Sequence, residues 1–365
     1  MIDSATDSTR PVRPGEEIDA TALAVWLKFR LPGIEGPVAV EQFPGGHSNL
    51  TYLLRFGDRE LVLRRPPFGS NVKTAHDMGR EFRVLSRLYA VYPKAPRALL
   101  HCDDPQVIGA PFYIMERVRG VILRHQKAPA GIVLDPPLMR SISEAAVDGL
   151  ADLHAVDWRA AGLEDLGRPE GYVARQVEGW TGRWRKARTD DVPDLDRAAA
   201  WLAENLPNPA ETAGAALIHN DYKYDNLVLH PQDLARVVAV LDWEMATIGD
   251  PLMDLGTSLG YWIDPDDPPA ARLLPAGPTT LPGNLSRAEA VQRYAVRSGR
   301  DVSGILFYFV YGLFKIAVIA QQIYFRYKQG LTHDERFASM IGAVKILGHT
   351  ASQAIQKSRI DRLET

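Results

Sequence analysis

Two neighbouring stretches of the chain predict its fold. Residues 216–229 read ALIHNDYKYDNLVL, and residues 237–244 read VVAVLDWE. Each stretch starts with a short apolar run typical of a buried strand, and polar side chains follow soon after each run. Asn226 lies five positions after Asp221, and the second run ends at Asp242. We therefore expect these three side chains to meet where the two strands end.

Such a trio is suited to a hard divalent cation. Carboxylate and amide oxygens are ligands that Mg²⁺ prefers, and Mg²⁺ commonly shares the rest of its shell with water and phosphate groups. The remaining aspartate can orient a hydroxyl group, as in the catalytic loop of a kinase. The spacing therefore indicates phosphoryl transfer. The simpler alternative is that each side chain only caps a turn by bonding to the backbone.

The region before these stretches carries groups suited to nucleotide phosphates. The predicted hairpin Pro44-Gly45-Gly46-His47-Ser48-Asn49 has backbone N–H groups that can approach phosphate oxygens. The run Leu61-Val62-Leu63-Arg64 places a cation at a strand end, and Glu81 lies on a predicted helix. A strand cation paired with a helix carboxylate would hold the α and β phosphates in register. The simpler alternatives are an ordinary Gly-Gly turn and a surface ion pair.

The wider pattern predicts an α+β protein with a small antiparallel-sheet lobe, which includes one helix, and a larger, mostly helical lobe. Short apolar or alternating runs, separated by glycine-containing turns, make up the first lobe. Its predicted strands lie at 38–40, 51–55, 61–64 and 112–115, and its predicted helix lies at 76–92. The second lobe has predicted helices at 138–154, 194–205 and 304–325.

Length and composition agree with two lobes. A chain of 365 residues, 46% hydrophobic and 24% charged, is long for one core and typical of an ordinary folded protein. We divide it into a flexible tail at 1–20, a nucleotide-binding lobe at 21–117 and a catalytic lobe at 118–365. The net charge of -3 gives no general attraction to nucleic acid or anionic membranes. The single cysteine, Cys102, excludes an internal disulfide and fits the cytoplasm.

Two further segments need an interpretation. Residues 304–325 approach membrane-spanning length, but Lys315 and Gln321 interrupt them, so we expect a buried core helix and no membrane span. Residues 264–284 contain six prolines and predict a long irregular loop. We expect the acidic residues of this loop to be solvated, namely Asp264, Asp266 and Asp267.

Several stretches carry a resemblance to a known family. They are FPGGHSNLTY at 43–52, VLRRPP at 62–67, GREF at 79–82, HNDYKYDNL at 219–227, LDWE at 241–244 and GDPLMDLG at 249–256. With these motifs the chain resembles the aminoglycoside phosphotransferase-like superfamily of small-molecule kinases, which has the two-lobed protein-kinase-like fold. It looks closest to the branch fused in some organisms to acyl-CoA dehydrogenases, whose C-terminal helix resembles residues 304–330.

The resemblance implies a role for each residue of the catalytic lobe's motifs. Asp221 would accept the proton of the acceptor hydroxyl, and Lys223 would steady the transferred phosphoryl group. Asn226 and Asp242 would hold Mg²⁺. Relatives often have glycine where this chain has Asn220.

The resemblance also implies an ATP site in the small lobe. The hairpin residues Gly45, Gly46, His47, Ser48 and Asn49 would cover the phosphates. The segment Met115-Glu116-Arg117-Val118 matches the hinge between lobes, whose backbone would read adenine, so Glu116 and Val118 are candidate nucleotide contacts. Protein kinases carry lysine where this chain has Arg64 or Arg65, and strand alternation favours Arg64 because it shares a face with Val62.

Other interpretations compete. Residues 256–260, GTSLG, fit the serine-hydrolase pattern G-x-S-x-G, with His333 and His349 downstream, but Pro251 suggests a helix where that motif needs a strand. A non-catalytic nucleotide-binding module is a second alternative. For an active kinase, the partners are ATP and a small hydroxylated acceptor. That acceptor is a hydroxyacyl-CoA if the branch assignment holds, and otherwise an aminoglycoside, choline or a sugar-like alcohol.

Overall fold

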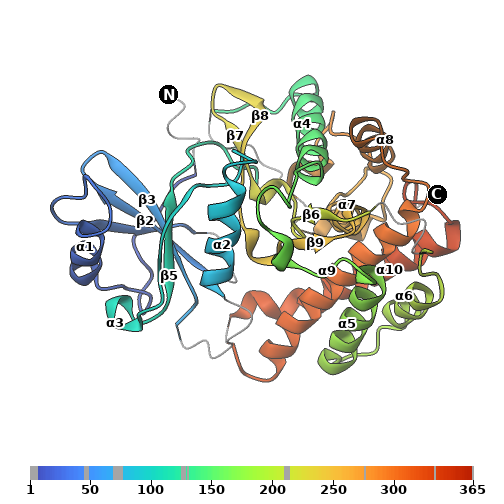
Figure 1. The fold of residues 1–365 in the computed structure, drawn as a ribbon. Helices are drawn as coiled ribbons and strands as arrows, with labels where there is room; N and C mark the ends of the chain where they lie inside the picture. The colour runs from blue at the N-terminus through green and yellow to red at the C-terminus, as the bar shows by residue number, and fades with distance from the viewer. Residues whose placement is uncertain are drawn as a thin grey trace.

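The structure is a computed structural model of the chain. It describes residues 7–44, 49–68, 77–124, 129, 131–208, 214–274, 277–332 and 334–363. Figure 1 shows a small N-terminal lobe, coloured blue to cyan, beside a larger and mostly helical C-terminal lobe. The predicted two-lobed α+β fold is therefore confirmed, while the proposed domain boundaries at residues 20 and 117 stay predictions.

The small lobe is built on a five-stranded antiparallel sheet with the order β1-β2-β3-β5-β4. Its strands are β1 (Ala39–Gln42), β2 (Leu50–Phe56), β3 (Arg59–Arg65), β4 (Ala98–Cys102) and β5 (Phe112–Glu116). Alternation along these strands gives the sheet two apolar faces. Helix α1 (Ala20–Lys28) packs on one face, and α2 (Met78–Leu88) packs on the other. The short helix α3 (Pro105–Ile108) precedes β5.

Helix α2 delivers a carboxylate into the protein interior. Asp77 caps the helix by accepting a hydrogen bond from the N–H of Arg80 at 2.8 Å, and this cap fixes the first turn. Glu81 lies in that first turn and is only 1% exposed, on the same buried face as Leu85 and Leu88. The helix is shorter than the predicted 76–92, because it ends at Leu88.

The large lobe is mostly helical. Its helices are α4 (Pro136–His154), α5 (Tyr172–Ala187), α6 (Pro193–Glu204), α7 (Pro251–Gly260), α8 (Arg287–Ser298), α9 (Ile305–Lys328) and α10 (Met340–Lys357). The predicted helices correspond to α4, α6 and α9 within two or three residues at each end. Figure 1 shows α9 running through this lobe between α7 and the pair α5 and α10.

Short strands frame the polar motifs of the large lobe. Strand β6 (Ala216–Ile218) pairs antiparallel with β9 (Thr247–Gly249), and β7 (Leu227–His230) pairs antiparallel with β8 (Asp233–Val240). The two predicted strands are thus present as β6 and β8. Their partners β7 and β9 are three or four residues long, and the sequence pattern alone did not indicate them.

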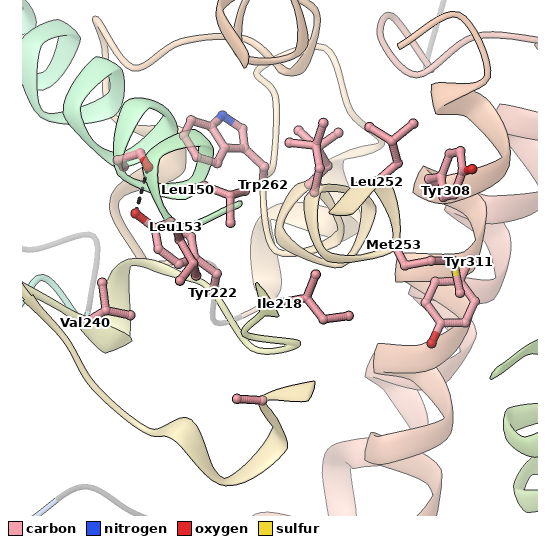
Figure 2. Close-up of a cluster of buried hydrophobic side chains, with 14 of the residues drawn as sticks. Leu150, Leu153, Ile218, Tyr222, Val240, Leu252, Met253, Trp262, Tyr308 and Tyr311 are labelled. Carbon is pink, nitrogen blue, oxygen red and sulfur yellow. Dashed lines mark hydrogen bonds between the residues drawn. The ribbon is translucent and has the colours of Figure 1, made fainter. Parts of the chain in front are cut away.

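A hydrophobic cluster supports these strands. Figure 2 shows helix α7 in the centre of this cluster, with Leu150, Leu153 and Tyr222 on its α4 side and Tyr308 and Tyr311 of α9 on the opposite side. The Tyr222 hydroxyl donates a hydrogen bond to the Ala146 carbonyl at 2.8 Å, which satisfies its one buried polar group. Because this cluster is closely packed, it restricts the movement of the segment that follows β6.

Helices α7 and α9 approach each other through two glycines. A Cβ atom at Gly256 would lie 2.1 Å from the Tyr308 carbonyl oxygen, and one at Gly312 would lie 2.0 Å from the Gly256 oxygen. No side chain fits at such distances, so glycine is required at both positions. This contact places α7, and hence the residues that it carries, against α9.

We predict that Gly256→Ala lowers the free energy of unfolding by about 1–3 kcal/mol, because the added methyl group forces the two helices apart. Urea denaturation would measure the change. The matched control is Gly182→Ala in α5, where an added Cβ atom would have no neighbour within 4 Å. This control should be neutral or gain about 0.5–1 kcal/mol from better helix propensity. Equal effects of the two substitutions would contradict the close-contact argument.

The apolar helix α9 is long and hydrophobic enough to cross a membrane by length and composition, but most of it is buried inside the protein. Lys315 and Gln321, which interrupt its apolar sequence, are themselves buried and hydrogen-bonded. This agrees with the predicted core helix. The cytoplasmic location stays a prediction.

Within the predicted flexible tail, Asp7 contacts Arg124, and Arg10 forms a bridge with Gln42, while the flexibility of this tail stays a prediction. The proline-rich loop differs from what the sequence suggested. In the proline-rich loop, Asp264 and Asp267 are buried against Arg287. Our interpretation of these two aspartates as solvated was wrong, because a buried guanidinium supplies the partner that a carboxylate needs away from water.

Candidate active site

The segment after β6 has a strained turn that directs Asp221 toward the cleft. Asn220 has φ of 67°, a left-handed conformation that asparagine tolerates better than most side chains and glycine tolerates best. Glycine, which the resemblance implies at this position in relatives, adopts this conformation without a steric cost. The Asn220 side-chain amide donates to the Met245 carbonyl at 3.1 Å, which ties this turn to the loop after Asp242.

A buried carboxylate holds the same turn from α7. Asp254 of this helix accepts the backbone N–H of His219 at 2.6 Å and that of Asn220 at 2.8 Å. Its Oδ2 also lies 3.1 Å from Nε2 of His154. Burial acts to raise the pKa of Asp254, but the hydrogen bond from His154 and the nearby imidazoles outweigh it and hold this pKa below its usual value. Asp254 is therefore an ionised anchor for the turn.

A lysine anchors the turn from α9. The ammonium group of Lys315 donates to the backbone oxygen of Asn220 at 2.7 Å and lies 3.3 Å from its side-chain oxygen. Lys315 is 1% exposed, and burial lowers its pKa to about 8.

The carboxylate of Asp221 lines the cavity between the lobes. Its Oδ1 accepts hydrogen bonds from Lys223 Nζ at 3.1 Å and from the Tyr261 hydroxyl at 3.0 Å. Its Oδ2 accepts one from Asn226 Nδ2 at 3.0 Å. Burial acts to lower the pKa of Lys223, but Tyr261 and Asp221 outweigh it and raise this pKa above its usual value. Lys223 is therefore charged, and it lies against the predicted base.

Asp242 stands at a second left-handed turn. Its φ is 68°, and the backbone N–H of the preceding Leu241 donates to the Asn226 carbonyl at 2.8 Å. That backbone bond places Asp242 beside Asn226. Arg64 Nη2 of the small lobe donates to Asp242 Oδ1 at 2.9 Å. Burial acts to raise the pKa of Asp242, but the Arg64 guanidinium outweighs it and lowers that pKa.

Arg64 also meets the carboxylate of helix α2. Its Nη1 lies 3.5 Å from Glu81 Oε1, and Glu81 accepts the backbone N–H of Trp243 at 3.2 Å. Burial raises the pKa of Glu81, against the opposing effect of Arg64. Arg65 points to the other face of the sheet, where its Nη1 donates to the Ile108 carbonyl at 3.0 Å. Strand alternation thus puts Arg64, and not Arg65, on the side of the cleft.

The loop after Asp242 is held by the small lobe at two more points. The amide of Asn49 donates to Glu244 Oε2 at 2.7 Å, so the end of the predicted hairpin reaches this loop. Arg80 donates to the carbonyls of Glu244 at 3.0 Å and Ala246 at 2.5 Å. The other hairpin residues that we predicted as phosphate contacts lie outside the described residues, namely Gly45, Gly46, His47 and Ser48.

A cavity of about 830 Å³ lies between the lobes and is lined by these groups. Glu116 and Val118, the predicted hinge contacts, line it, as do Asn49, Arg64 and Glu81 of the small lobe. Asp221, Lys223, Asn226 and Asp242 line it from the large lobe. Within the described residues, no cluster of three or more His, Cys, Asp or Glu side chains is arranged for a metal. A metal here would need the Asn226 amide and ligands from a bound substrate.

The serine-hydrolase motif lies in the wrong structural context. Ser258 is inside helix α7, whereas a nucleophile elbow needs a strand immediately before the serine. His349 lies on α10 and pairs with Asp194 at 3.5 Å, while His333 falls outside the described residues. The structure offers no elbow at residues 256–260.

Most of the chain matches a known protein family. Residues 39–289 match the phosphotransferase enzyme family. The chain belongs to this family. It is 36% identical to acyl-CoA dehydrogenase family member 10 of Mus musculus over 87% of the chain and 29% of that protein. It is 34% identical to family member 11 of Homo sapiens over 95% of the chain and 44% of that protein. The chain thus spans less than half the length of these relatives.

Solved structures of family members share the fold. A provisionally named aminoglycoside phosphotransferase of Ralstonia eutropha JMP134 has a TM-score of 0.78 and 31% identity, over 93% of this chain and 99% of that one. A thermostable mutant of aminoglycoside phosphotransferase APH(4)-Ia, solved with AMP-PNP and hygromycin B, has a TM-score of 0.56 and 17% identity, over 90% and 98%. The chain therefore has the kinase-like fold of the phosphotransferase enzyme family, and the predicted resemblance is confirmed.

Three residues of the site were not predicted from the sequence. Asp254 lies in a quoted motif, GDPLMDLG, yet nothing in its spacing indicates that it binds backbone N–H groups. Tyr261 and Lys315 come from segments far along the chain. For Lys315 the sequence did hold a signal, because this lysine interrupts an apolar helix. A buried ammonium group without a partner is unfavourable, so its presence there implies a nearby acceptor.

We predict a pH-dependent effect of Lys315 on stability. Between about pH 8, its folded pKa, and about pH 10.4, the usual lysine pKa, the unfolded state holds a proton that the folded state has released. The free energy of unfolding therefore rises with pH in this window, relative to a Lys315→Met variant. Urea titrations would measure the free energy of unfolding of the wild type minus that of the variant at pH 7 and at pH 10. This value should increase by on the order of 1–3 kcal/mol between the two pH values. Lys345→Met, at an exposed position of α10, should show a constant difference.

Proposed function

We propose that this phosphotransferase moves the γ-phosphoryl group of ATP, with Mg²⁺, to a hydroxyl group of a small metabolite. The observation that carries the proposal is the gathering of Asp221, Asn226 and Asp242 at one cavity between the lobes. Two segments that are separate in the sequence but adjacent in space supply these oxygens. A non-catalytic nucleotide-binding module is the alternative, and it has no need for Asp221 at this place.

The donor set fits Mg²⁺. We assign Asn226 and Asp242 as its protein ligands, with phosphate and water oxygens completing the shell. The Asn226 amide nitrogen is turned toward Asp221, which leaves the amide oxygen for the ion. The lowered pKa of Asp242 keeps that carboxylate ionised at neutral pH. When bound, the ion would neutralise charge on the phosphate oxygens and align them.

The remaining groups have distinct tasks in the proposal. Asp221 orients the acceptor hydroxyl and takes its proton as the acceptor oxygen bonds to the γ-phosphorus and ADP leaves. Lys223 steadies the transferred phosphoryl group through its charge. Arg64, held by Glu81, contacts the phosphates in the role that lysine has in protein kinases. The hairpin from Gly45 to Asn49 covers them.

We assign the purine to the hinge. The backbone N–H of Glu116 already donates to the Arg97 carbonyl at 2.9 Å, so Val118 is the better placed donor of the two predicted contacts. The binding of AMP-PNP by a solved structure with the same fold supports an adenine nucleotide as co-substrate.

We assign one part of the cavity to the acceptor, and the residues that line it suit a molecule with an apolar chain and an anionic group. Beyond Asp221 the lining includes Ile319, Ile323 and Met340, with Arg336 at the rim and 72% of its side chain exposed. A hydroxyacyl-CoA has both properties, and the similarity to acyl-CoA dehydrogenase family members favours it. Arg336 is itself paired with Asp334, so an anionic acceptor group would share the guanidinium with that carboxylate.

We predict that Asp221→Asn lowers kcat by a factor of roughly 10²–10⁴, the usual contribution of a positioned base, and leaves the Kd for MgATP nearly unchanged. Asp242→Asn should instead weaken MgATP binding. The measurement is incubation with MgATP and a panel of hydroxyacyl-CoAs, aminoglycosides and amino alcohols, followed by detection of a phosphorylated product by mass. Asp233→Asn, at an exposed position of β8, is the matched control and should behave like the wild type.

Near-normal turnover of Asp221→Asn on its best acceptor would rule out the base. Nucleotide binding by the wild type without any product or ATP hydrolysis would favour the non-catalytic module.

We predict that Arg336→Gln raises KM for a hydroxyacyl-CoA acceptor about 5- to 10-fold, as expected for one exposed charge contact, and leaves KM for ATP unchanged. Steady-state kinetics at two salt concentrations would check this, because the effect should shrink as salt rises. The control is Arg326→Gln, an exposed arginine on α9. The same KM for both variants would exclude Arg336 from acceptor binding.

A further inference from the structure

Hydrogen bonds fully occupy the carboxylate of Asp221. Its Oδ1 accepts from the Tyr261 hydroxyl at 3.0 Å and from Lys223 Nζ at 3.1 Å. Its Oδ2 accepts from Asn226 Nδ2 and from Lys223 Nζ, both at 3.0 Å. An ionised carboxylate offers about four lone-pair positions, and these contacts use all of them. An incoming hydroxyl group can therefore bond to Asp221 only when one of these donors leaves.

The donors differ in how firmly they are held. Asn226 Nδ2 also donates to the Asp221 backbone oxygen at 2.8 Å, and the Asn226 backbone N–H donates to the Lys223 oxygen at 2.9 Å. Lys223 is charged and reaches both carboxylate oxygens, which makes its contacts charge-assisted. Tyr261 makes a single, neutral contact to one oxygen. Among the described donors, the Tyr261 hydroxyl is therefore the easiest to displace.

The position of Tyr261 suits such an exchange. It follows the last residue of α7 and lines the cavity beside Trp262. Lys223 Nζ lies 4.7 Å from the centre of its ring, so the ring supports the ammonium group whether or not the hydroxyl is bound to Asp221. Its O–H is the same chemical group that an alcohol acceptor would present to the base.

We propose that Tyr261 is a positioning residue whose hydroxyl occupies the place of the acceptor hydroxyl on Asp221 until an acceptor displaces it. This inference rests on the proposed kinase function. The same contact also acts on water, which is the most abundant source of a hydroxyl group. A water molecule must displace the Tyr261 hydroxyl from Asp221 before it can react. The resting contact therefore suppresses wasteful hydrolysis of ATP.

Water is the probe, because its use requires no knowledge of the acceptor. In that reaction the water oxygen bonds to the γ-phosphorus, the bond from this phosphorus to the β–γ bridging oxygen breaks, and Asp221 takes the proton. Phosphate release from MgATP, without acceptor, should be faster in Tyr261→Phe than in the wild type. We expect a rise of roughly 2- to 12-fold, which corresponds to the net strength of one neutral hydrogen bond. The KM for ATP should not change.

The matched control is Tyr308→Phe. The Tyr308 hydroxyl also contacts an aspartate, Asp250 at 3.3 Å, but Tyr308 lies on α9 and does not line the cavity. This control should release phosphate at the wild-type rate. Thermal unfolding would check that Tyr261→Phe is folded, and this variant keeps the ring that contacts Lys223. With the best acceptor found, Tyr261→Phe should lower the acceptor KM and keep kcat.

The outcomes separate the two proposals. If the wild type neither binds nor hydrolyses MgATP, the kinase proposal fails and the role of Tyr261 fails with it. If the wild type hydrolyses MgATP but Tyr261→Phe is no faster, or is slower, only the role of Tyr261 is overturned. An equal rise in Tyr308→Phe would also overturn it, because general loosening of the fold would then explain the gain. A merely structural tyrosine would lower activity, so a gain is the diagnostic result.

Discussion

The buried carboxylate of Asp254 is the constraint on which the rest of the site depends. It accepts two consecutive backbone N–H groups, those of His219 and Asn220, and thereby fixes the left-handed turn that aims Asp221 at the cavity. Because the turn is strained, it needs support from outside the segment. Asp254 supplies this from α7, and Lys315 supplies it from α9 by holding the Asn220 carbonyl. The close packing of α7 on α9 through Gly256 and Gly312 brings these two anchors to the same turn.

A second set of contacts joins the two lobes at the same place. Arg64 lies between Glu81 of its own lobe and Asp242 of the other, so one guanidinium links the helix α2, the sheet and the loop that follows β8. Arg80 and Asn49 bind that loop as well. The lowered pKa of Asp242 and the raised pKa of Glu81 both follow from this shared, buried arrangement. A nucleotide entering the cavity would meet a cation already oriented by two carboxylates.

Much of the fold could be predicted from the sequence, because local pattern and local chemistry agree. The apolar runs before His219 and Asp242 became β6 and β8, and the alternation Val62, Arg64 placed Arg64 on the cleft side of the sheet. Short strands such as β7 and β9 were not predicted, because three or four residues are too few to show a periodic pattern. Asp264 and Asp267 were misjudged for a related reason: their partner Arg287 lies about 20 residues away and only the folded chain brings it near.

The sequence by itself determined which chemical groups are present and in what order along the chain: two apolar strands followed by side-chain oxygens, a strand arginine, a helix glutamate and a family signature. These are local properties, fixed by spacing and side-chain type. Only the tertiary structure decided which distant groups complete the site. Tyr261 on Asp221, Asp254 beneath the turn and Lys315 from an apolar helix are separated from Asp221 by 40, 33 and 94 positions. No periodicity connects residues so far apart, and the packing of α7 against β6 and of α9 against α7 is what brings them together.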